Sequence, residues 1–522
     1  MRQVKRWCLA LPAVLVLAGS ALGARDPGTS AAWPSGTAVI SYESEQALAA
    51  ALDHNPAQVV RRIRALQVVA LRPAGSVERF AQRIGAEPGI VRVDRAAARR
   101  SRTEPALAAP APGLPYQWQF AAVRADQVPP AVAQAAAAYT IAVIDTGADL
   151  TAPDLSAKTP HTYSLRSRLA DVPDTSGHGT FVAALAAGSS TNGDGIAGVG
   201  GDAGLMVVQA GGSGGAFTDV DEAAAIVYAV DHGAKIVNLS LGGSSTSAVE
   251  KRAVDYATAK GVLLVAAVGN GYLRGNEVEY PAALLQPVGS RGVGGSGLSV
   301  AASTLEGRRA AFSNTGSHVS LAAPGVGVFS AVSSASPVAS YPRTALPGSL
   351  GGVYGYGSGT SFASPQVAGA AALVWAANPQ LRAGEVAGIL EQTATGNGSW
   401  NPGLGYGVLD VAAAVAKAQV TTPSPAPAVA PRAPAVRVQL HGKRVGTRVA
   451  LWWRATGEIA GFRVSVRTSG RPVRILTAAA TRRSAVYTLA PGAYRFIVAA
   501  LDAEGRQLAV SRPWSVTVPR AR

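Results

Sequence analysis

The chain has 522 residues, with 47 lysines and arginines against 31 acidic residues, which gives a formal net charge of +16. This length exceeds what one hydrophobic core supports, so we expect roughly two to four folding units. The single cysteine, Cys8, excludes a disulfide framework and any function that depends on a pair of thiols.

The first 23 residues have the pattern of a cleaved secretory signal. Three basic residues precede an apolar run from Leu9 to Leu17, and small residues follow as far as Gly23. The run is too short for a membrane span, whereas a basic start, a short apolar core and small residues at the end are typical of a signal peptide. The sequence therefore predicts a secreted protein, cleaved after Gly23, whose mature chain lacks Cys8.

Residues 24–112 are expected to form a small α+β unit followed by a processing region. Three apolar runs predict strands at residues 38–42, 68–71 and 89–94, and two further stretches predict helices at residues 58–66 and 77–84. A basic run follows, comprising Arg95, Arg99, Arg100 and Arg102. Because this run separates the unit from the next one, we interpret it as a site of proteolytic processing; the alternative is a solvated linker.

Residues 113–420 alternate short aliphatic strands with Ala-rich helical segments. This pattern predicts an α/β fold in which helices cover both faces of a doubly wound, mostly parallel sheet. Asp145 ends an apolar strand, at the edge of the sheet where the sites of α/β proteins assemble. His178 opens one helical run between two glycines, and Ser361 opens another. A helix N-terminus carries partial positive charge, which stabilises a developing anion.

The composition changes twice in the last part of the chain. Residues 421–434 form a Pro-rich tract, which predicts a semi-rigid extended linker. Residues 435–522 contain apolar runs that alternate at period two between turn residues, which predicts an antiparallel β-sandwich. This module resembles fibronectin type III and similar immunoglobulin-like domains.

The positive charge is concentrated in this last module. Residues 435–522 carry sixteen lysines and arginines against three acidic residues, while residues 115–420 carry fifteen against twenty. A basic surface attracts polyanions because binding releases their counter-ions. The module is therefore predicted to bind an anionic cell-envelope polymer; the alternative is arginines that only fill the solvent face of the strands. Nothing in the sequence indicates specific recognition of nucleic acid.

Asp145, His178 and Ser361 together supply the parts of a serine nucleophile site. Serine is a poor nucleophile until a base takes its proton, and the base needs a carboxylate that holds its tautomer and stabilises its charged form. The order Asp, His, Ser along the chain is that of subtilisin. From about Tyr116 to Val420, these segments resemble those of the subtilisin-like serine peptidases, the subtilases.

The resemblance implies a mechanism without a cofactor. Ser361 would attack the scissile carbonyl of a protein or peptide substrate. His178 would act as general base and then as general acid, while Asp145 would orient and stabilise the imidazolium. An acyl-enzyme would form and then be hydrolysed.

The resemblance also implies which residues bind the substrate and the oxyanion. Asn270 follows an apolar run, residues 262–268, after Gly269, and its amide would donate to the oxyanion. Removing such a donor costs roughly 3–4 kcal/mol of transition-state stabilisation. The substrate-binding residues would lie in the family-like stretch 236–243 and are Ser240, Leu241 and Gly242.

Specificity is predicted from the residue before the pair Tyr280 and Pro281. In the family, that position lies at the base of the main specificity pocket, and in this chain it is Glu279. A carboxylate in an apolar pocket is poorly solvated unless a cation reaches it, so we expect a preference for Arg or Lys on the acyl side of the cut. One alternative is that Glu277, and not Glu279, occupies this position. The other is that the enzyme has a broad preference for large apolar residues.

Structural calcium is expected from the resemblance. Asp154 matches a frequent ligand position of the family, and Asn192 and Asp194 lie in the loop after the histidine helix. Calcium prefers several oxygen ligands, of which the resemblance matches one aspartate and a polar loop.

The β/α alternation of residues 24–112 resembles the inhibitory propeptides that precede subtilase catalytic domains. In the family such a unit is a folding template and blocks the site until it is cleaved. The sequence therefore predicts a secreted serine endopeptidase made as a zymogen, with its own propeptide as an inhibitor. The alternative is a secreted scaffold or adhesion protein with an inactive peptidase-like region, which the presence of all four expected site residues disfavours.

Overall fold

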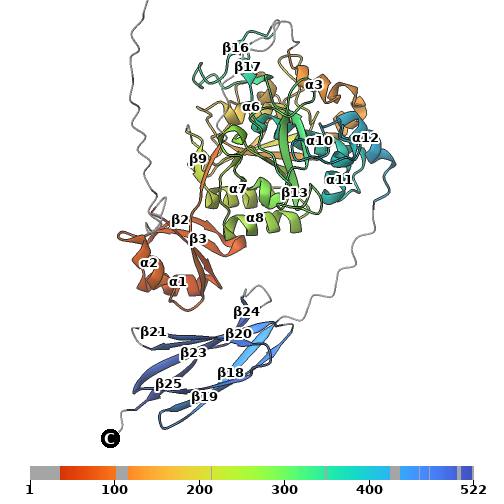
Figure 1. Cartoon of the computed structure of the whole chain (residues 1–522). Coiled ribbons are helices and arrows are strands. Elements are labelled where there is room, and N and C mark those ends of the chain that lie inside the picture. Colours follow the sequence, from red (N-terminus) through yellow and green to blue (C-terminus); the bar gives the residue numbers. More distant parts are fainter. Residues whose placement is uncertain are drawn as a thin grey trace, which may run out of the picture.

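The computed structural model describes most of the chain (Figure 1): residues 36–101, 116–212, 214–346, 349, 351–423, 436–457, 459–468, 471–501 and 507–519. The predicted signal peptide, residues 1–23, lies outside the described residues, as do residues 424–434 of the predicted linker. Among the helices that the structure describes, none is both long enough and apolar enough to cross a membrane.

The N-terminal unit is a four-stranded antiparallel sheet in the order β2-β3-β1-β4 with two helices. Its elements are β1 (Ala38–Tyr42), α1 (Glu45–His54), β2 (Gln58–Ile63), β3 (Val68–Arg72), α2 (Val77–Ile84) and β4 (Ile90–Arg95). Apolar side chains of the helices, such as Leu48 and Phe80, pack with Ile40 into one small core. The opposite face of the sheet packs against the rest of the molecule through Val39 and Ile63.

The predicted helix over residues 58–66 is wrong. This stretch forms β2 and a single 3-10 turn, Arg64–Leu66, while the helix lies earlier, in α1. The β-branched residues Val59, Val60 and Ile63 favour extended backbone, and pairing with β3 supplies the hydrogen bonds. Helix α1 begins where the Ser44 side chain accepts from the Ala47 N–H, an N-cap.

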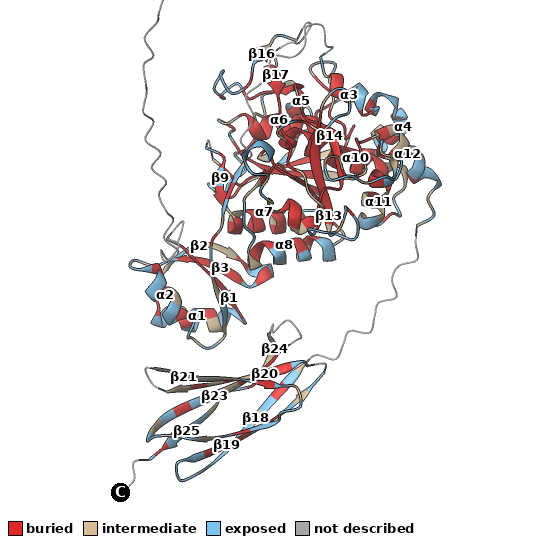
Figure 2. Ribbon diagram, in the orientation of Figure 1, coloured by how far each residue is buried: buried red, intermediate tan, exposed pale blue. Residues whose placement is uncertain are grey.

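The central part is a doubly wound α/β fold, which confirms the predicted fold class. Its seven strands are all parallel to their neighbours, in the order β14-β13-β12-β10-β6-β8-β7. They are β6 (Thr140–Asp145), β7 (His161–Ser164), β8 (Gly204–Gln209), β10 (Ala234–Leu239), β12 (Leu263–Ala267), β13 (Gly297–Ser303) and β14 (Leu321–Pro324). Figure 2 shows buried residues concentrated in this sheet and in the helices beside it.

Helices cover both faces of this sheet. One face packs on α6 (His178–Ala187) and α10 (Thr360–Ala377), and the other packs on α7 (Asp219–Asp231) and α8 (Ala248–Ala259). Side chains alternate accordingly along β6: Ile141 and Val143 point to the first layer, and Ala142 and Ile144 point to the second. This two-sided burial explains why the strands are continuous apolar runs.

Shorter elements complete the central part. The helices are α3 (Trp118–Ala122), α4 (Pro130–Ala135), α5 (Pro153–Ser156), α9 (Ala282–Leu285), α11 (Ala383–Thr393) and α12 (Val411–Val420). One small antiparallel sheet consists of β15 (Val328–Ala331), β16 (Arg343–Thr344) and β17 (Tyr354–Gly357). Another, in the order β11-β5-β9, joins β5 (Ala98–Ser101) to β9 (Ala216–Thr218) and β11 (Leu241–Gly242). The N-terminal unit therefore continues as a strand of the central part.

The C-terminal part consists of antiparallel strands, as predicted. One sheet has the order β18-β19-β22, and the other has the order β21-β20-β23-β24 with β25 beside β23. The strands are β18 (Arg437–Val445), β19 (Arg448–Thr456), β20 (Gly461–Thr468), β21 (Arg471–Ala479), β22 (Ser484–Thr488), β23 (Gly492–Leu501), β24 (Gln507–Val510) and β25 (Trp514–Val518). Trp453 from one sheet and Phe462 and Phe496 from the other share one core.

Candidate active site

The three predicted catalytic side chains stand at the ends of elements that meet at one edge of the central sheet. Asp145 is the last residue of β6, His178 is the first residue of α6, and Ser361 is in the first turn of α10. All three are buried. The rings of His178 and Phe362, the residue after Ser361, lie 5.7 Å apart, so α6 and α10 bring the histidine and the serine to the same place.

Glycines allow the backbone to come close enough for this arrangement. Gly147, two residues after Asp145, has a φ of +125°, in a region that L side chains rarely adopt. A Cβ on Gly179 would lie 2.1 Å from the Gly147 carbonyl oxygen. Only glycine therefore lets the loop after β6 pack directly on the first turn of α6.

The histidine ring is held by the aspartate. His178 Nδ1 lies 2.7 Å from Asp145 Oδ1, which also accepts from the Thr146 N–H at 2.7 Å. Because a carboxylate only accepts, this contact favours the tautomer with the proton on Nδ1. A charge-assisted hydrogen bond of this kind stabilises the pair by roughly 1.5–3 kcal/mol.

Asp174 shapes the histidine loop, and the sequence analysis missed it. Its two carboxylate oxygens accept from the Gly177 N–H at 2.9 Å, the Thr180 N–H at 2.8 Å and the Thr180 hydroxyl at 2.6 Å. It also accepts from the hydroxyl of Thr146, which follows Asp145, at 2.8 Å. Only its position four residues before His178, in a Gly- and Ser-rich loop, could have indicated this role.

Asn270 is held against the start of α10. Its Oδ1 accepts from both the backbone N–H and the hydroxyl of Thr360, each at 2.9 Å. These contacts use the carbonyl side of the amide, so the Nδ2 donor is turned the other way. Thr360 was also missed, although its place directly before Ser361 at a helix N-terminus was visible in the sequence.

Ser240 is in direct contact with Ser361. Its hydroxyl donates to the Ser361 carbonyl oxygen at 2.7 Å and accepts from Asn238 Nδ2 at 2.9 Å. The next two residues, Leu241 and Gly242, form β11, the edge that pairs with β5. The structure thus brings the predicted substrate-binding stretch next to the predicted nucleophile.

Glu279 lies beside the residue that precedes Asn270. A Cβ on Gly269 would lie 2.3 Å from Glu279 Oε1, and that oxygen accepts from Asn314 Nδ2 at 3.2 Å. Glu279 is half-buried, whereas the alternative residue, Glu277, is exposed. The geometry therefore places the carboxylate of Glu279 against the backbone beside Asn270.

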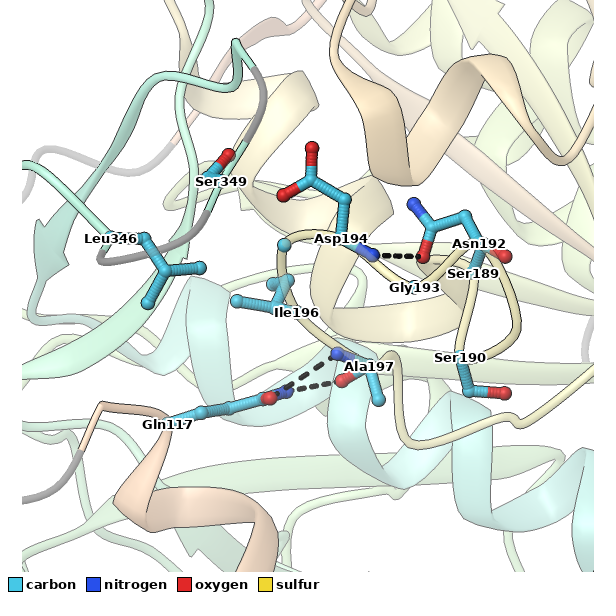
Figure 3. A pocket seen from close by; sticks show the side chains of 11 residues that line it. Gln117, Ser189, Ser190, Asn192, Gly193, Asp194, Ile196, Ala197, Leu346 and Ser349 are labelled. Carbon is cyan, nitrogen blue, oxygen red and sulfur yellow. Dashed lines mark hydrogen bonds between the residues drawn. The ribbon is translucent and has the colours of Figure 1, made fainter.

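Two of the predicted metal ligands, Asn192 and Asp194, line a pocket of about 540 Å³ (Figure 3), whereas Asp154 is not one of its lining residues. Asp154 Oδ1 accepts from the Ile196 N–H at 2.6 Å, and Oδ2 accepts from the Tyr354 hydroxyl at 2.9 Å. Burial raises the pKa of Asp154 to about 6, and the neighbouring Asp194 carboxylate adds to this shift. Asn192 Oδ1 accepts from the Asp194 N–H at 3.3 Å.

These side chains supply only oxygen donors, which fits calcium in type. Figure 3 shows the Asp194 carboxylate beside this pocket, with Asn192 next to it. Within the described ranges, however, no group of three or more His, Cys, Asp or Glu residues could hold a metal ion. Calcium at Asp154, Asn192 and Asp194 therefore stays a prediction.

Comparison with known proteins identifies the class of fold and then the family. Residues 136–407 match the sequence model of the subtilase family. The fold is similar to that of fervidolysin from Fervidobacterium pennivorans, described as a keratinolytic enzyme related to subtilisin. The TM-score is 0.61 and the sequence identity 24%, over 92% of this chain and 76% of that chain. The chain belongs to the subtilase family, whose members are subtilisin-like serine peptidases.

Two curated relatives agree with this assignment. The thermophilic serine proteinase of Bacillus sp. (strain AK1) is 37% identical over 263 residues, which is 50% of this chain and 58% of that protein. Thermitase from Thermoactinomyces vulgaris is 33% identical over 255 residues, which is 49% of this chain and 80% of that protein. The matches thus cover about half of this chain.

We predict that Thr360 positions the amide of Asn270. Thr360→Val should lower kcat about 10-fold and leave KM unchanged, because the amide donates to the oxyanion only in the transition state and a misplaced amide would stabilise that state less. Thr360→Ser, which keeps the hydroxyl, should restore kcat. Thr393→Val is the matched control, since that hydroxyl donates to the Ile389 carbonyl in α11. A rise in KM with unchanged kcat would contradict this role.

Proposed function

We propose that this chain is a secreted serine endopeptidase that hydrolyses protein substrates with Asp145, His178 and Ser361. The observation that carries this proposal is the buried contact of 2.7 Å between His178 Nδ1 and Asp145 Oδ1, at the edge where α10 presents Ser361. Membership of the subtilase family supports the same assignment.

These contacts support the following mechanism. His178 Nε2 takes the Ser361 proton as Ser361 Oγ attacks the scissile carbonyl, and the imidazolium is stabilised by Asp145. The tetrahedral oxyanion is stabilised by Asn270 Nδ2, which Thr360 orients, and by the positive end of α10. His178 then protonates the leaving amine, and water attacks the acyl-enzyme by the same steps in reverse. No cofactor takes part in these steps.

We further propose that residues 24–112 act as an inhibitory propeptide. Strand β5 lies between β9 and β11, with antiparallel pairing on both sides. Ser101 pairs with Leu241 and donates its N–H to the Gly215 carbonyl at 2.8 Å. Since Ser240, next to Leu241, contacts Ser361, β5 occupies the place that an extended substrate would take. Arg102, the last member of the predicted processing run, lies outside the described residues.

The remaining assignments are part of the same proposal. Glu279 gives the main specificity pocket a negative charge and so a preference for Arg or Lys on the acyl side of the cut. Asp154, Asn192 and Asp194 hold a structural calcium ion. Residues 435–522 form a basic fibronectin type III-like module that attaches the secreted enzyme to an anionic cell-envelope polymer.

The first prediction from this proposal concerns self-processing. Ser361→Ala should accumulate as an uncleaved precursor under conditions in which the wild type is processed, because the variant lacks the nucleophile. Intact-mass analysis of the secreted protein measures this directly. Ser156→Ala, at an exposed serine, is the matched control and should be processed normally. Normal processing of pure Ser361→Ala protein would contradict the assignment.

The second prediction concerns specificity. In a peptide library varied at the acyl-side residue, Arg and Lys should exceed Phe and Leu in kcat/KM by at least about 10-fold, since they neutralise Glu279. Glu279→Gly should remove this preference, whereas the control Glu277→Gly should keep it. The idea fails if Phe and Leu are preferred and Glu279→Gly changes nothing.

The third prediction concerns calcium. EDTA should lower the melting temperature of the processed protein by several degrees, and excess calcium should restore it, because a ligand that binds only the folded state stabilises it. Asp154→Asn should lose most of this response, while Asp126→Asn, at an exposed carboxylate, should keep it. An unchanged melting temperature in EDTA would exclude the site.

A further inference from the structure

Arg99 is a buried cation that the mechanism does not use. Only 1% of this residue is exposed, although it lies in the short strand β5. Its Nε lies 2.7 Å from Glu222 Oε2, and its Nη2 lies 2.7 Å from Glu250 Oε2. Both carboxylate side chains are fully buried, so the guanidinium and its two partners form an ion cluster without contact with water.

The pocket belongs to the central part, and its occupant belongs to the N-terminal unit. Glu222 lies on α7 and Glu250 lies on α8, the two helices on one face of the central sheet. Asp219, at the start of α7, accepts from the Ala97 N–H at 2.8 Å, and its own N–H donates to the Ala97 carbonyl at 2.9 Å. These contacts hold the backbone of the incoming segment just before Arg99.

The segment binds as a substrate would, by its main chain. Arg99 pairs with Phe217 of β9, and Arg100 pairs with both Ala216 and Gly242. Main-chain pairing of this kind does not depend on the sequence that is bound, so selection must come from side chains that enter pockets. Arg99 is such a side chain, whereas Arg100 is exposed.

The two carboxylates make this pocket favour a cation over an apolar side chain. Burial, and then the neighbouring Glu250 carboxylate, raise the pKa of Glu222 to about 8, against the opposing effect of Arg99. The second oxygens, Glu222 Oε1 and Glu250 Oε1, are buried and have no hydrogen-bond partner among the described residues. An apolar side chain would leave the two carboxyl groups either charged side by side or protonated without hydrogen-bond partners, and both states are costly in a dry pocket.

We propose that Glu222 and Glu250 form an arginine-recognition subsite of the processed enzyme, which the propeptide's own Arg99 fills in the zymogen. The preferred substrates are protein segments that bind in an extended conformation between β9 and β11. Such a segment carries an arginine two residues before the substrate residue that pairs with Leu241. This subsite is separate from the pocket of Glu279. The inference rests on the proposed peptidase function and adds a second basic requirement to its substrates.

The test uses the processed wild-type enzyme and peptides with the sequence of residues 96–107. The peptide whose arginine at the position of Arg99 is replaced by leucine should lose about 100-fold or more in kcat/KM, because a buried charge pair loses one partner. The matched peptide with leucine at the position of Arg100 should lose less than about 3-fold, since that side chain is exposed. Equal losses for the two peptides, or no loss, overturn the proposal.

Variants of the enzyme locate the effect. Glu222→Gln keeps the shape of the pocket but removes one charge. For this variant, kcat/KM for the parent peptide should exceed kcat/KM for the peptide with leucine at the position of Arg99 by less than about 10-fold. Glu306→Gln, at an exposed carboxylate, should keep the full ratio. If Glu222→Gln does not fold, the comparison of peptides on wild-type enzyme decides alone.

Three further outcomes separate this inference from the proposed function. N-terminal sequencing of the processed protein should find that the mature chain starts after Ser101. If the mature chain still contains Arg99, this side chain would continue to fill the pocket and no substrate could use it, which overturns the subsite. Hydrolysis of casein without any arginine preference overturns the subsite alone. Absence of hydrolysis of every substrate, including casein, overturns both.

Discussion

The site depends on one packing constraint, the close contact between the loop after β6 and the first turn of α6. Gly147 and Gly179 allow it, and it brings Asp145 and His178 within 2.7 Å of each other. Because the pair is buried, its hydrogen bond acts in a low dielectric, where it is stronger than in water. The rings of Phe181 and Phe362, 4.1 Å apart, pack α6 on α10, so the same constraint positions Ser361.

The N-terminal unit contacts the central part in two ways: some contacts do not depend on the bound sequence, and one requires a cation. The sheet face of the unit packs on α7 and α8, where Arg61 Nη2 lies 2.7 Å from Asp221 Oδ1. Strand β5 adds main-chain pairing that any sequence could make, and Arg99 adds a buried ion cluster that only a cation could make. Removing one partner from such a cluster costs about 3–5 kcal/mol. Under the proposed function, the acidic pocket would contribute both to inhibition by the N-terminal unit and to selection among substrates.

Much of the fold could be predicted because its signals are local. The strands β6 and β12 are apolar runs, and Asp145, His178 and Ser361 each occupy the end of an element in a recognisable order. The stretch 58–66 was mispredicted as a helix, because pairing with β3 decides its conformation. Thr360 and Glu222 were missed for a similar reason. Their partners lie 90 and 123 residues away along the chain, so only the folded structure shows these contacts.

Labelling with a serine-directed fluorophosphonate tests the assignment of Ser361. The reagent labels a serine whose proton is taken by a base, at a site that stabilises the negative charge developing on the reagent's oxygen. The processed protein should carry a single adduct, located on Ser361 by mass spectrometry, and the intact zymogen should react far more slowly because β5 covers the site. An adduct on another serine, or no adduct on the processed protein, would contradict the proposed mechanism.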